Sequence, residues 1–348
     1  MIQNTISDQV RNLSAGTLRR ETPLPLLITG VAGVPGYNAL PYFTEKYPGQ
    51  VVGVRQVNNW RMLGDNIVAC DVEDIDGLKR LFDQYQFRAV LNCGGSCALK
   101  SCELDPSMAW RINFESVRNL LHVLEGSDTR LVQLSIDLVY SDKLGGGYYE
   151  HEPTDPVTIY GKTMAASENL IQLERPESAI LRISLPMGIS FNGHAGAIDW
   201  IQSRFIKDKP ATLYYDEIRT PTYTDCLNRV IDDMLGRDSA GIFHAGGPRR
   251  LSLYQIAQII NRVGDYNPNH LMGCLREEAG PVPPRAGDVT MDSTKLADEL
   301  GYEPFDPWPL HDCWMPTHHD WHHERPTDEL RGPQQILDLL YRNPRHAV

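Results

Sequence analysis

The chain has 348 residues, enough to bury a sizeable apolar core in one large domain or in a main domain with a smaller appendage. Its formal net charge of -12 argues against a nucleic-acid-binding protein, because phosphate recognition needs clustered lysine and arginine. No stretch approaches the roughly 18 apolar residues of a membrane span, so we expect no membrane-spanning segment.

Residues 1–24 are polar and mixed in charge, which predicts a terminal arm or a short helix outside the core. Apolar runs then alternate with helix-like segments. The expected strands lie at residues 24–30, 50–56, 66–72, 87–95, 130–140 and 178–188, and the expected helices at residues 38–47, 76–86, 106–126 and 162–174. This alternation predicts right-handed βαβ units, and therefore an α/β Rossmann-type fold with a doubly wound parallel sheet covered on both faces.

The alternation fades from about Phe191, where glycine, proline and aromatic residues become frequent. We assign residues 25–190 to a Rossmann domain, residues 191–310 to a small mixed substrate-binding region partly interleaved with the sheet, and residues 311–348 to a C-terminal tail. Ligands of doubly wound sheets bind outside the carboxyl ends of the strands. We therefore expect the smaller region to rest on those strand ends and to complete the binding site.

The seven cysteines form an odd number without a compact disulfide framework, and no apolar signal segment precedes the first expected strand. This usage predicts a reducing, cytoplasmic location. Cys93, Cys97 and Cys102 lie close together, but no matching second pair accompanies them. The histidine-rich segment from His318 to His323 could hold a transition metal in principle, although such a segment is more typical of a surface turn. We therefore expect no metal site.

The segment LLITGVAGVPGYNAL places three glycines between an apolar strand and a helix. Gly30 allows the tight turn, Gly33 lets the backbone approach a pyrophosphate, and Gly36 lets helix and strand pack closely. The free N–H groups of the first helical turn would then face the phosphates. The alternative is a plain strand-to-helix turn that needs glycine for its dihedral angles. The predicted dinucleotide contacts in this turn are Gly30, Val31, Ala32, Gly33, Val34, Pro35 and Gly36.

Arg55 ends the second expected strand, where an NAD-binding protein usually carries Asp or Glu to bind the ribose hydroxyls. A guanidinium there suits a 2′-phosphate, so we predict NADP as the cofactor, with NAD as the alternative. Asp71 follows the third strand and could accept a hydrogen bond from the adenine amine, or could instead cap the next helix. The remaining expected cofactor contacts are Val72, Cys93, Gly94 and Gly95.

Seven motifs occur in the order found in extended short-chain dehydrogenases/reductases. They are TGVAGVPG, VLNCGGSCALKSCELDPSMAWRINFESVRNL, SIDLVYS, PTDPVTIYGKTMAASENLI, LRISLPMG, RTPTYTDCL and PPRAGDVTMDSTKLADELGYEP. The chain most resembles the dTDP-4-dehydrorhamnose reductase branch, which also includes the regulatory β subunit of methionine adenosyltransferase, and the resemblance spans about Leu24 to Pro309. It implies a Rossmann domain that binds NAD(P) and a small C-terminal domain that binds a nucleotide sugar.

The chemistry that this resemblance implies is hydride transfer between a nicotinamide and a sugar ring carbon. A tyrosine acts as acid or base, a lysine four residues later tunes it, a Ser or Thr binds the carbonyl oxygen, and an asparagine often completes the set. Tyr160 matches the tyrosine and Asn113 the asparagine. Ile136 stands at the hydroxyl position and Met164 at the lysine position. Two of the four expected groups are therefore missing.

Two neighbouring residues could replace them. Lys162 lies two residues after Tyr160, but about 200° of helical rotation would direct it to roughly the opposite face. Ser135 precedes Ile136, and successive strand residues point to opposite sides unless a bulge intervenes. We name Tyr160, Asn113, Ser135 and Lys162 as the catalytic candidates. Loss of a hydrogen-bond donor at the reacting oxygen typically slows such a reaction roughly 100- to 1000-fold.

Arg285 is expected to meet a substrate phosphate, with a structural ion pair as the alternative. The other substrate candidates are Arg219 and His194. His194 belongs to a loop that could close over a substrate, with a mobile surface loop as the alternative. In this family two long helices often form a homodimer interface, and residues 109–124 and 164–174 would be those helices here. Core packing alone would give both helices the same apolar stripe.

Three functions remain open. The first, our working hypothesis, is an NAD(P)-dependent reductase of a nucleotide-linked 4-keto sugar with Tyr160 as proton donor. The second is a catalytically impaired NADP-binding protein that regulates or scaffolds a protein partner. The third is a nucleotide-sugar epimerase or dehydratase with bound cofactor.

Overall fold

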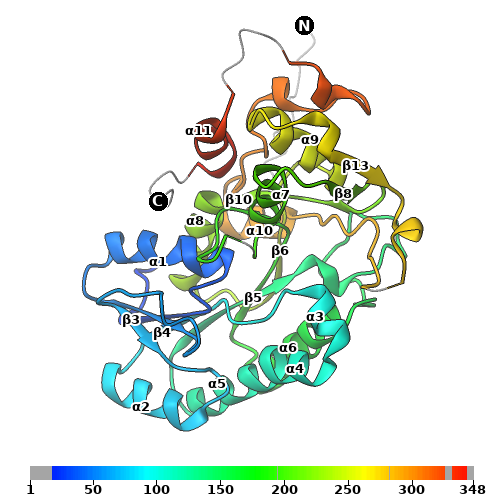
Figure 1. Cartoon of the computed structure of the whole chain (residues 1–348). Helices are drawn as coiled ribbons and strands as arrows, with labels where there is room; N and C mark the ends of the chain where they lie inside the picture. The colour runs from blue at the N-terminus through cyan, green and yellow to red at the C-terminus, as the bar shows by residue number, and fades with distance from the viewer. Residues whose placement is uncertain (1–17, 194, 282, 326–330, 343–348) are drawn as a thin grey trace, which may run out of the picture.

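Seven parallel strands form the central sheet of the computed structural model, which describes residues 18–193, 195–281, 283–325 and 331–342 (Figure 1). Their spatial order is β11-β6-β5-β4-β1-β2-β3, and every neighbouring pair is parallel. The bounds are Leu26–Thr29 (β1), Val51–Arg55 (β2), Ile67–Ala69 (β3), Ala89–Asn92 (β4), Arg130–Ile136 (β5), Ala179–Ile183 (β6) and Gly241–Ala245 (β11). The expected doubly wound parallel sheet is confirmed.

Alternate strand residues enter two separate cores. Leu26 and Ile28 of β1 belong to the core on one face of the sheet, and Leu27 between them belongs to the core on the other face. The first face is covered by α1 (Val34–Lys46) and α8 (Thr224–Leu235), and the second by α2 (Ile75–Tyr85), α5 (Ser116–Leu124) and the C-terminal part of α6 (Ile159–Glu174). Burial of both faces explains why the strands are nearly continuous apolar runs.

The helix expected over residues 106–126 is divided by a π-helical turn. Its two parts, α4 (Pro106–Trp110) and α5, are joined by η1 (Arg111–Glu115). A short helix, α3 (Leu99–Leu104), precedes α4. Single π-helical turns inside helices are frequent at functional sites, and this one carries Asn113.

The C-terminal half of the chain contributes to the sheet and also forms a layer above the strand ends. β11 and α8 join the Rossmann layers, although the sequence did not indicate β11 as a strand. The separate layer contains α7 (Ala197–Ile206), α9 (Leu253–Val263) and the parallel pair β8 (Ala211–Tyr214) and β13 (Leu271–Cys274) (Figure 1). Smaller elements connect the two parts: β7 (Pro186–Met187) with β10 (Thr222–Tyr223), β9 (Ile218–Arg219) with β12 (Leu251–Ser252), and α10 (Thr294–Leu300).

Both ends of the described chain pack against this framework. Trp321, in the C-terminal tail, lies under the guanidinium of Arg262 from α9, 4.1 Å from ring centre to Cζ. The N-terminal arm is described only from Leu18 onward, and Arg19 pairs with buried Asp232 of α8 at 2.7 Å. Among the described residues, no helix has the length and apolar character needed to cross a membrane. The same residues include no group of three side chains able to hold a metal ion.

Candidate functional site

The turn between β1 and α1 brings three glycines close to other backbone atoms. Gly30 has a φ of +65°, and a Cβ there would lie 2.4 Å from the carbonyl oxygen of Cys93. A Cβ on Gly36 would lie 2.5 Å from the carbonyl oxygen of Gly30. At Gly33 the nearest atom to a Cβ would be 3.5 Å away, so this position has free space around it. Folding therefore requires glycine at positions 30 and 36, whereas position 33 borders a cavity.

The first turn of α1 offers backbone donors to an anion. Gly33 is the N-cap, and no side chain caps the turn. The N–H groups of Val34 and Gly36 have no acceptor within the helix, and the helix N-terminus carries a positive partial charge. Pro35 has no N–H, so this turn offers one donor fewer than usual. Gly33, Val34 and Pro35 line the cavity, as expected for a phosphate-binding turn.

Side chains behind the glycine turn connect the ends of β1 and β4. The Thr29 hydroxyl donates to Asn92 Oδ1, and the N–H of Gly94 donates to the same oxygen at 3.2 Å. The predicted contacts Cys93, Gly94 and Gly95 all line the cavity. Four predicted contacts of the glycine turn do not line it: Gly30, Val31, Ala32 and Gly36. Val31 is buried in the core, and the carbonyl of Ala32 accepts a backbone hydrogen bond from a later loop.

Arg55 ends β2 with its guanidinium folded over its own turn. Its Nη1 donates to two carbonyl oxygens of that turn, at 3.0 and 3.2 Å, and its Nε is buried without a partner among the described residues. Asp71 accepts a hydrogen bond from the N–H of Val57 at 3.0 Å and so holds the loop after β2. It does not cap the next helix, because Asp74 is the N-cap of α2. Val72 packs against the core under α2.

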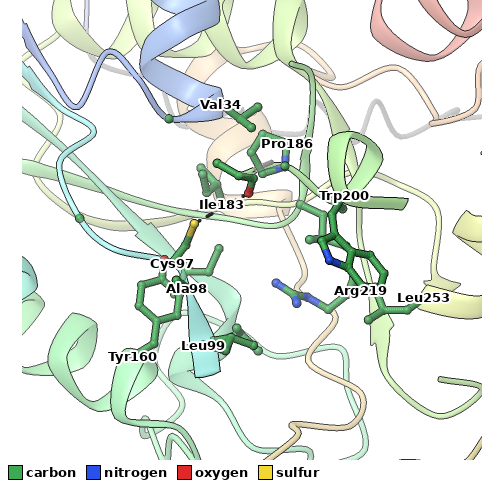
Figure 2. Close-up of a pocket in the computed structure, with 18 of the residues that line it drawn as sticks. Val34, Cys97, Ala98, Leu99, Tyr160, Ile183, Pro186, Trp200, Arg219 and Leu253 are labelled. Atoms are coloured by element: carbon green, nitrogen blue, oxygen red, sulfur yellow. Dashed lines mark hydrogen bonds between the residues drawn. The ribbon is translucent and has the colours of Figure 1, made fainter. Parts of the chain in front are cut away.

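A cavity of about 810 Å³ lies between the strand ends and the C-terminal layer (Figure 2). The glycine turn and the end of β4 border it on one side. Tyr160 and Met164 of α6 line it, as do Trp200 of α7 and Arg219 of β9 from the C-terminal region. Pockets of roughly 300–1,000 Å³ accept ligands of drug or cofactor size. The cavity is therefore large enough to hold reacting portions of two ligands.

Tyr160 lies in the first turn of α6, which Thr158 caps by accepting a hydrogen bond from the N–H of Gly161 at 2.9 Å. The Tyr160 side chain is 8% exposed, and its hydroxyl makes no hydrogen bond to any residue in the described part of the chain. Burial raises the pKa of Tyr160 well above its usual value; Asp137 adds to the rise and Arg219 opposes it. The phenol is consequently protonated at neutral pH.

Ile136 and Met164, which stand where the family resemblance implies a hydroxyl and an ammonium, both face the cavity that Tyr160 lines. Ile136, at the end of β5, is 9% exposed, and Met164, one helical turn after Tyr160, is 5% exposed. Neither side chain carries a charge or donates a hydrogen bond. The positions that the family resemblance assigns to a hydroxyl and an ammonium are therefore apolar in the folded protein.

Neither Lys162 nor Ser135 replaces these groups, which corrects their assignment as catalytic candidates. Lys162 is exposed and does not line the cavity, because two residues of helical rotation turn it to the outer face of α6. Ser135 borders the cavity, yet its hydroxyl donates to Glu168. Glu168 in turn forms a bidentate pair with buried Arg182, at 2.9 and 2.7 Å. Ser135 therefore belongs to a structural polar network behind β5.

Asn113 connects η1 to α6 and to the loop after β4. Its Oδ1 accepts from the N–H of Ser96 at 2.7 Å, and its Nδ2 donates to Thr163 Oγ1 at 2.9 Å. The Thr163 hydroxyl donates to the carbonyl oxygen of Tyr160 at 2.8 Å. Asn113 is 2% exposed and does not line the cavity. It therefore holds the backbone around Tyr160 from behind the cavity wall.

Three arginines of the C-terminal region line the cavity, Arg204, Arg219 and Arg285, and the last two are the predicted substrate contacts. The guanidinium of Arg285 lies 4.6 Å from the ring centre of Tyr214, and its Nη1 is 3.5 Å from Glu217. Arg219 forms a buried bidentate pair with Asp137, with 2.6 Å between Nε and Oδ2. Burial raises the pKa of Glu217, while Arg219 and Arg285 oppose the rise. Both predicted substrate arginines thus line the cavity, and both also pair with carboxylates.

The remaining substrate candidate, His194, lies outside the described residues. Glu217, Trp200 and Tyr214 line the cavity although sequence reasoning did not single them out. They belong to no recognisable motif, and the aromatic residues around position 214 were the only local signal. Their place in the site depends on how β8, β9 and α7 pack above the strand ends.

A family model described as "RmlD substrate binding domain" matches residues 25–309. The dTDP-4-dehydrorhamnose reductase of Aggregatibacter actinomycetemcomitans is 22% identical over 295 residues, covering 81% of this chain and 95% of that protein. Methionine adenosyltransferase 2 subunit beta of Xenopus laevis is 24% identical over 286 residues, covering 78% and 80%. The probable low-salt glycan biosynthesis reductase Agl14 of Haloferax volcanii is 24% identical over 176 residues, and the match spans 50% of this chain and 59% of that protein.

The solved structure of dTDP-4-dehydrorhamnose reductase from Bacillus anthracis, in complex with NADP, shares the fold. The TM-score is 0.70 at 18% sequence identity, over 84% of this chain and 96% of that chain. The family match extends from the first strand of the sheet through the C-terminal layer, and it includes the glycine turn, Tyr160 and Arg285. The chain therefore belongs to the RmlD substrate-binding domain family.

Proposed function

We propose that this protein is an NADP-dependent reductase of a nucleotide-linked 4-keto sugar, in which Tyr160 donates the proton as a neutral phenol. The observation that carries the proposal is the location of Tyr160 in one cavity that extends from Gly33 to Arg285. One end of this cavity offers a helix N-terminus to cofactor phosphates, and the other offers a guanidinium to a substrate phosphate. Relatives and a structural neighbour named as dTDP-4-dehydrorhamnose reductases support the same activity.

The residues of the glycine turn fit a dinucleotide. Gly33 leaves free space at the cavity edge, and the N–H group of Val34, which lines the cavity, has no acceptor within the helix and is available to a pyrophosphate. Arg55 has a buried Nε without a described partner, and its guanidinium would bind a 2′-phosphate, which favours NADP over NAD. A bound nicotinamide would supply the hydride for the reaction.

Tyr160 suits reduction better than oxidation. Reduction of a ketone requires a proton donor, and a phenol with a raised pKa keeps its proton at neutral pH. As negative charge develops on the carbonyl oxygen, the Tyr160 hydroxyl would donate a hydrogen bond to it and then transfer its proton. Ile136 and Met164 add only apolar surface, which keeps water away from the reacting atoms. A phenol with a raised pKa is also a weaker acid, so we expect a slow enzyme.

A second candidate function is a catalytically impaired NADP-binding protein that regulates or scaffolds a protein partner. The apolar side chains at both Ile136 and Met164 favour it, because they remove two polar groups from the reacting end while the glycine turn is kept. The likeness to methionine adenosyltransferase 2 subunit beta also supports it. The two functions share cofactor binding and differ in the need for the Tyr160 proton.

We further propose a homodimer through the continuous helical segment of α4, η1 and α5 and through α6. Trp110 on α4 is 40% exposed and Leu173 on α6 is 80% exposed, so each helix offers apolar surface to a second copy. Light scattering should give the mass of a dimer, and Trp110→Lys should shift the equilibrium toward the monomer. A monomer at micromolar concentration would overturn this part of the proposal.

The deciding experiment combines the purified protein with NADPH and dTDP-4-keto-6-deoxyglucose, and follows the loss of NADPH absorbance. Tyr160→Phe should abolish turnover and leave NADPH binding, measured by fluorescence, within about twofold of wild type. If NADPH binds, no keto sugar is reduced and Tyr160→Phe changes nothing, the regulatory function is favoured. Copurification of a stoichiometric protein partner would then support that second function.

A further inference from the structure

The guanidinium of Arg219 is held rigidly at the cavity wall. Its Nε donates to Asp137 Oδ2 at 2.6 Å, and its Nη2 donates to Asp137 Oδ1. Ser184 donates to the same carboxylate, so Asp137 is itself fixed at the end of β5. The Arg219 side chain is 4% exposed and the Asp137 side chain 0%. This planar, two-point contact leaves the guanidinium one orientation.

The third nitrogen of Arg219 faces the cavity without a hydrogen bond. Within the described part of the chain, the acid nearest to Nη1 is Glu217, 3.8 Å away, which is longer than a hydrogen bond. No described residue accepts a hydrogen bond from Nη1. In Figure 2 the guanidinium extends toward the side of the cavity that Tyr160 and Leu99 line. Arg219 thus presents two charged N–H donors to whatever ligand occupies this space.

The other cations that line the cavity are less suited to act near Tyr160. Lys100 is exposed, and Arg204 donates through Nε and Nη2 to the carbonyl oxygen of Pro210, at 2.9 and 2.7 Å. Arg285 lies over the ring of Tyr214, and its side chain is 23% exposed. Among the described lining residues, Arg219 is the buried cation, and it is near enough to Tyr160 to oppose the rise of its pKa.

We propose that Arg219 Nη1 donates a hydrogen bond to the carbonyl oxygen of the substrate, and so replaces the hydroxyl and the ammonium that positions 136 and 164 lack. This inference rests on the proposed reductase function. The carbonyl carbon gains the hydride that the cofactor supplies, and the oxygen gains the proton of Tyr160, which becomes a phenolate until solvent returns a proton. Arg219 keeps all its protons and stabilises the negative charge on the oxygen. Asp137 is a positioning residue, because it acts only by orienting Arg219.

Two simpler interpretations predict different kinetics. Arg219 could instead bind a substrate phosphate, whose charge is the same before and during the reaction. Removing the Arg219 guanidinium would then raise KM and leave kcat unchanged. If the Arg219–Asp137 pair only holds β9 against β5, its loss changes stability and neither kinetic constant. A donor to the reacting oxygen is more strongly bound as charge develops, so its loss lowers kcat.

The test uses the double variant Arg219→Met with Asp137→Asn, because removing both charges leaves neither partner as an unpaired buried ion, while Glu217 keeps its pair with Arg285. NADPH consumption is measured with dTDP-4-keto-6-deoxyglucose, NADPH affinity by fluorescence, and folding by circular dichroism. We expect kcat to fall about 100-fold, with KM and NADPH affinity within about threefold of wild type. The matched control Arg285→Met removes a second cavity arginine and should mainly raise KM.

Chemical rescue provides a readout that a purely structural pair would not affect. Arg219→Ala leaves space for a small guanidinium, and added methylguanidinium should raise kcat of this variant at least about tenfold. An active wild-type enzyme whose double variant keeps its kcat, or changes only KM, would overturn the role of Arg219 and leave the reductase function standing. A wild-type protein that binds NADPH and reduces no keto sugar would overturn both.

Discussion

Replacing Met164 with lysine would return a cation to the cavity wall beside Tyr160. Residues four apart on a helix have Cβ atoms about 5–6 Å from each other, so an ammonium at position 164 can approach the phenol. Met164 is 5% exposed and borders the cavity, which gives the new side chain room to extend along the wall. The substitution tests whether the missing charge limits proton donation by Tyr160.

Coulomb's law sets the expected size of the effect. At an effective dielectric constant of about 20 and a separation of about 6 Å, two unit charges interact by about 2.8 kcal/mol. This energy corresponds to about two pKa units, and partial burial of the ammonium will reduce it. The pKa of Tyr160 should therefore fall by up to about two units. With proton transfer about half complete in the transition state, kcat for reduction should rise about tenfold.

The assay follows NADPH consumption with dTDP-4-keto-6-deoxyglucose, and tyrosinate absorbance is titrated separately with Tyr160→Phe as the baseline. Met164→Gln is the matched control, because it is similar in length and polar but uncharged. Of the two variants, only Met164→Lys should show the lower titration midpoint and the higher kcat. If Met164→Lys folds and binds NADPH, yet neither its midpoint nor its rate differs from that of Met164→Gln, the electrostatic reasoning is refuted.

Three further predictions follow from the glycine turn and from two shifted pKa values. Gly30→Ala should lower the free energy of unfolding in urea by about 2–4 kcal/mol, because of its positive φ and the contact with a carbonyl oxygen. Gly33→Ala should change the free energy of unfolding by less than about 1 kcal/mol and weaken NADPH binding about tenfold. Equal destabilisation by the two substitutions would contradict the separate roles of Gly30 in folding and Gly33 in binding. Because the pKa of Tyr160 is raised, its proton stays in place and kcat for reduction should stay level between about pH 7 and about pH 9; a fall centred in that window would identify another donor. Burial lowers the pKa of His244 to about 3, and Arg182 adds to the effect. Below about pH 6.5 the His244 imidazole therefore binds a proton in the unfolded state but stays neutral in the folded state. Stability should therefore fall by about 2 kcal/mol between about pH 6.5 and about pH 5, and this loss should be absent in His244→Asn.

Local patterns were sufficient to predict much of the fold and part of the site. Gly30, Gly33 and Gly36 are spaced between a strand and a helix, and their backbone roles depend only on that short segment. The direction of the Ile136 and Met164 side chains was also predictable, because strand and helix periodicity places both of them on the side that Tyr160 faces. The same periodicity indicated that Lys162 points away.

Contacts between distant segments were not predictable in the same way. The sequence allowed Asp71 to be a helix cap, but Asp74 has that role and Asp71 holds the loop after β2 instead. Arg219 was predicted as a substrate contact, and the sequence did not indicate its pairing with Asp137, which lies 82 positions away. β11 joins the sheet beside β6 although its short sequence resembled the irregular region around it.

The sequence by itself determined the parallel sheet, the glycine turn and the apolar residues at positions 136 and 164, because each of these depends on neighbours within one strand, turn or helix. The tertiary structure alone decided which charged groups face the cavity and in what direction. A long side chain has many rotamers, and the one it adopts depends on the partner that the folded chain brings to it, as Asp137 does for Arg219.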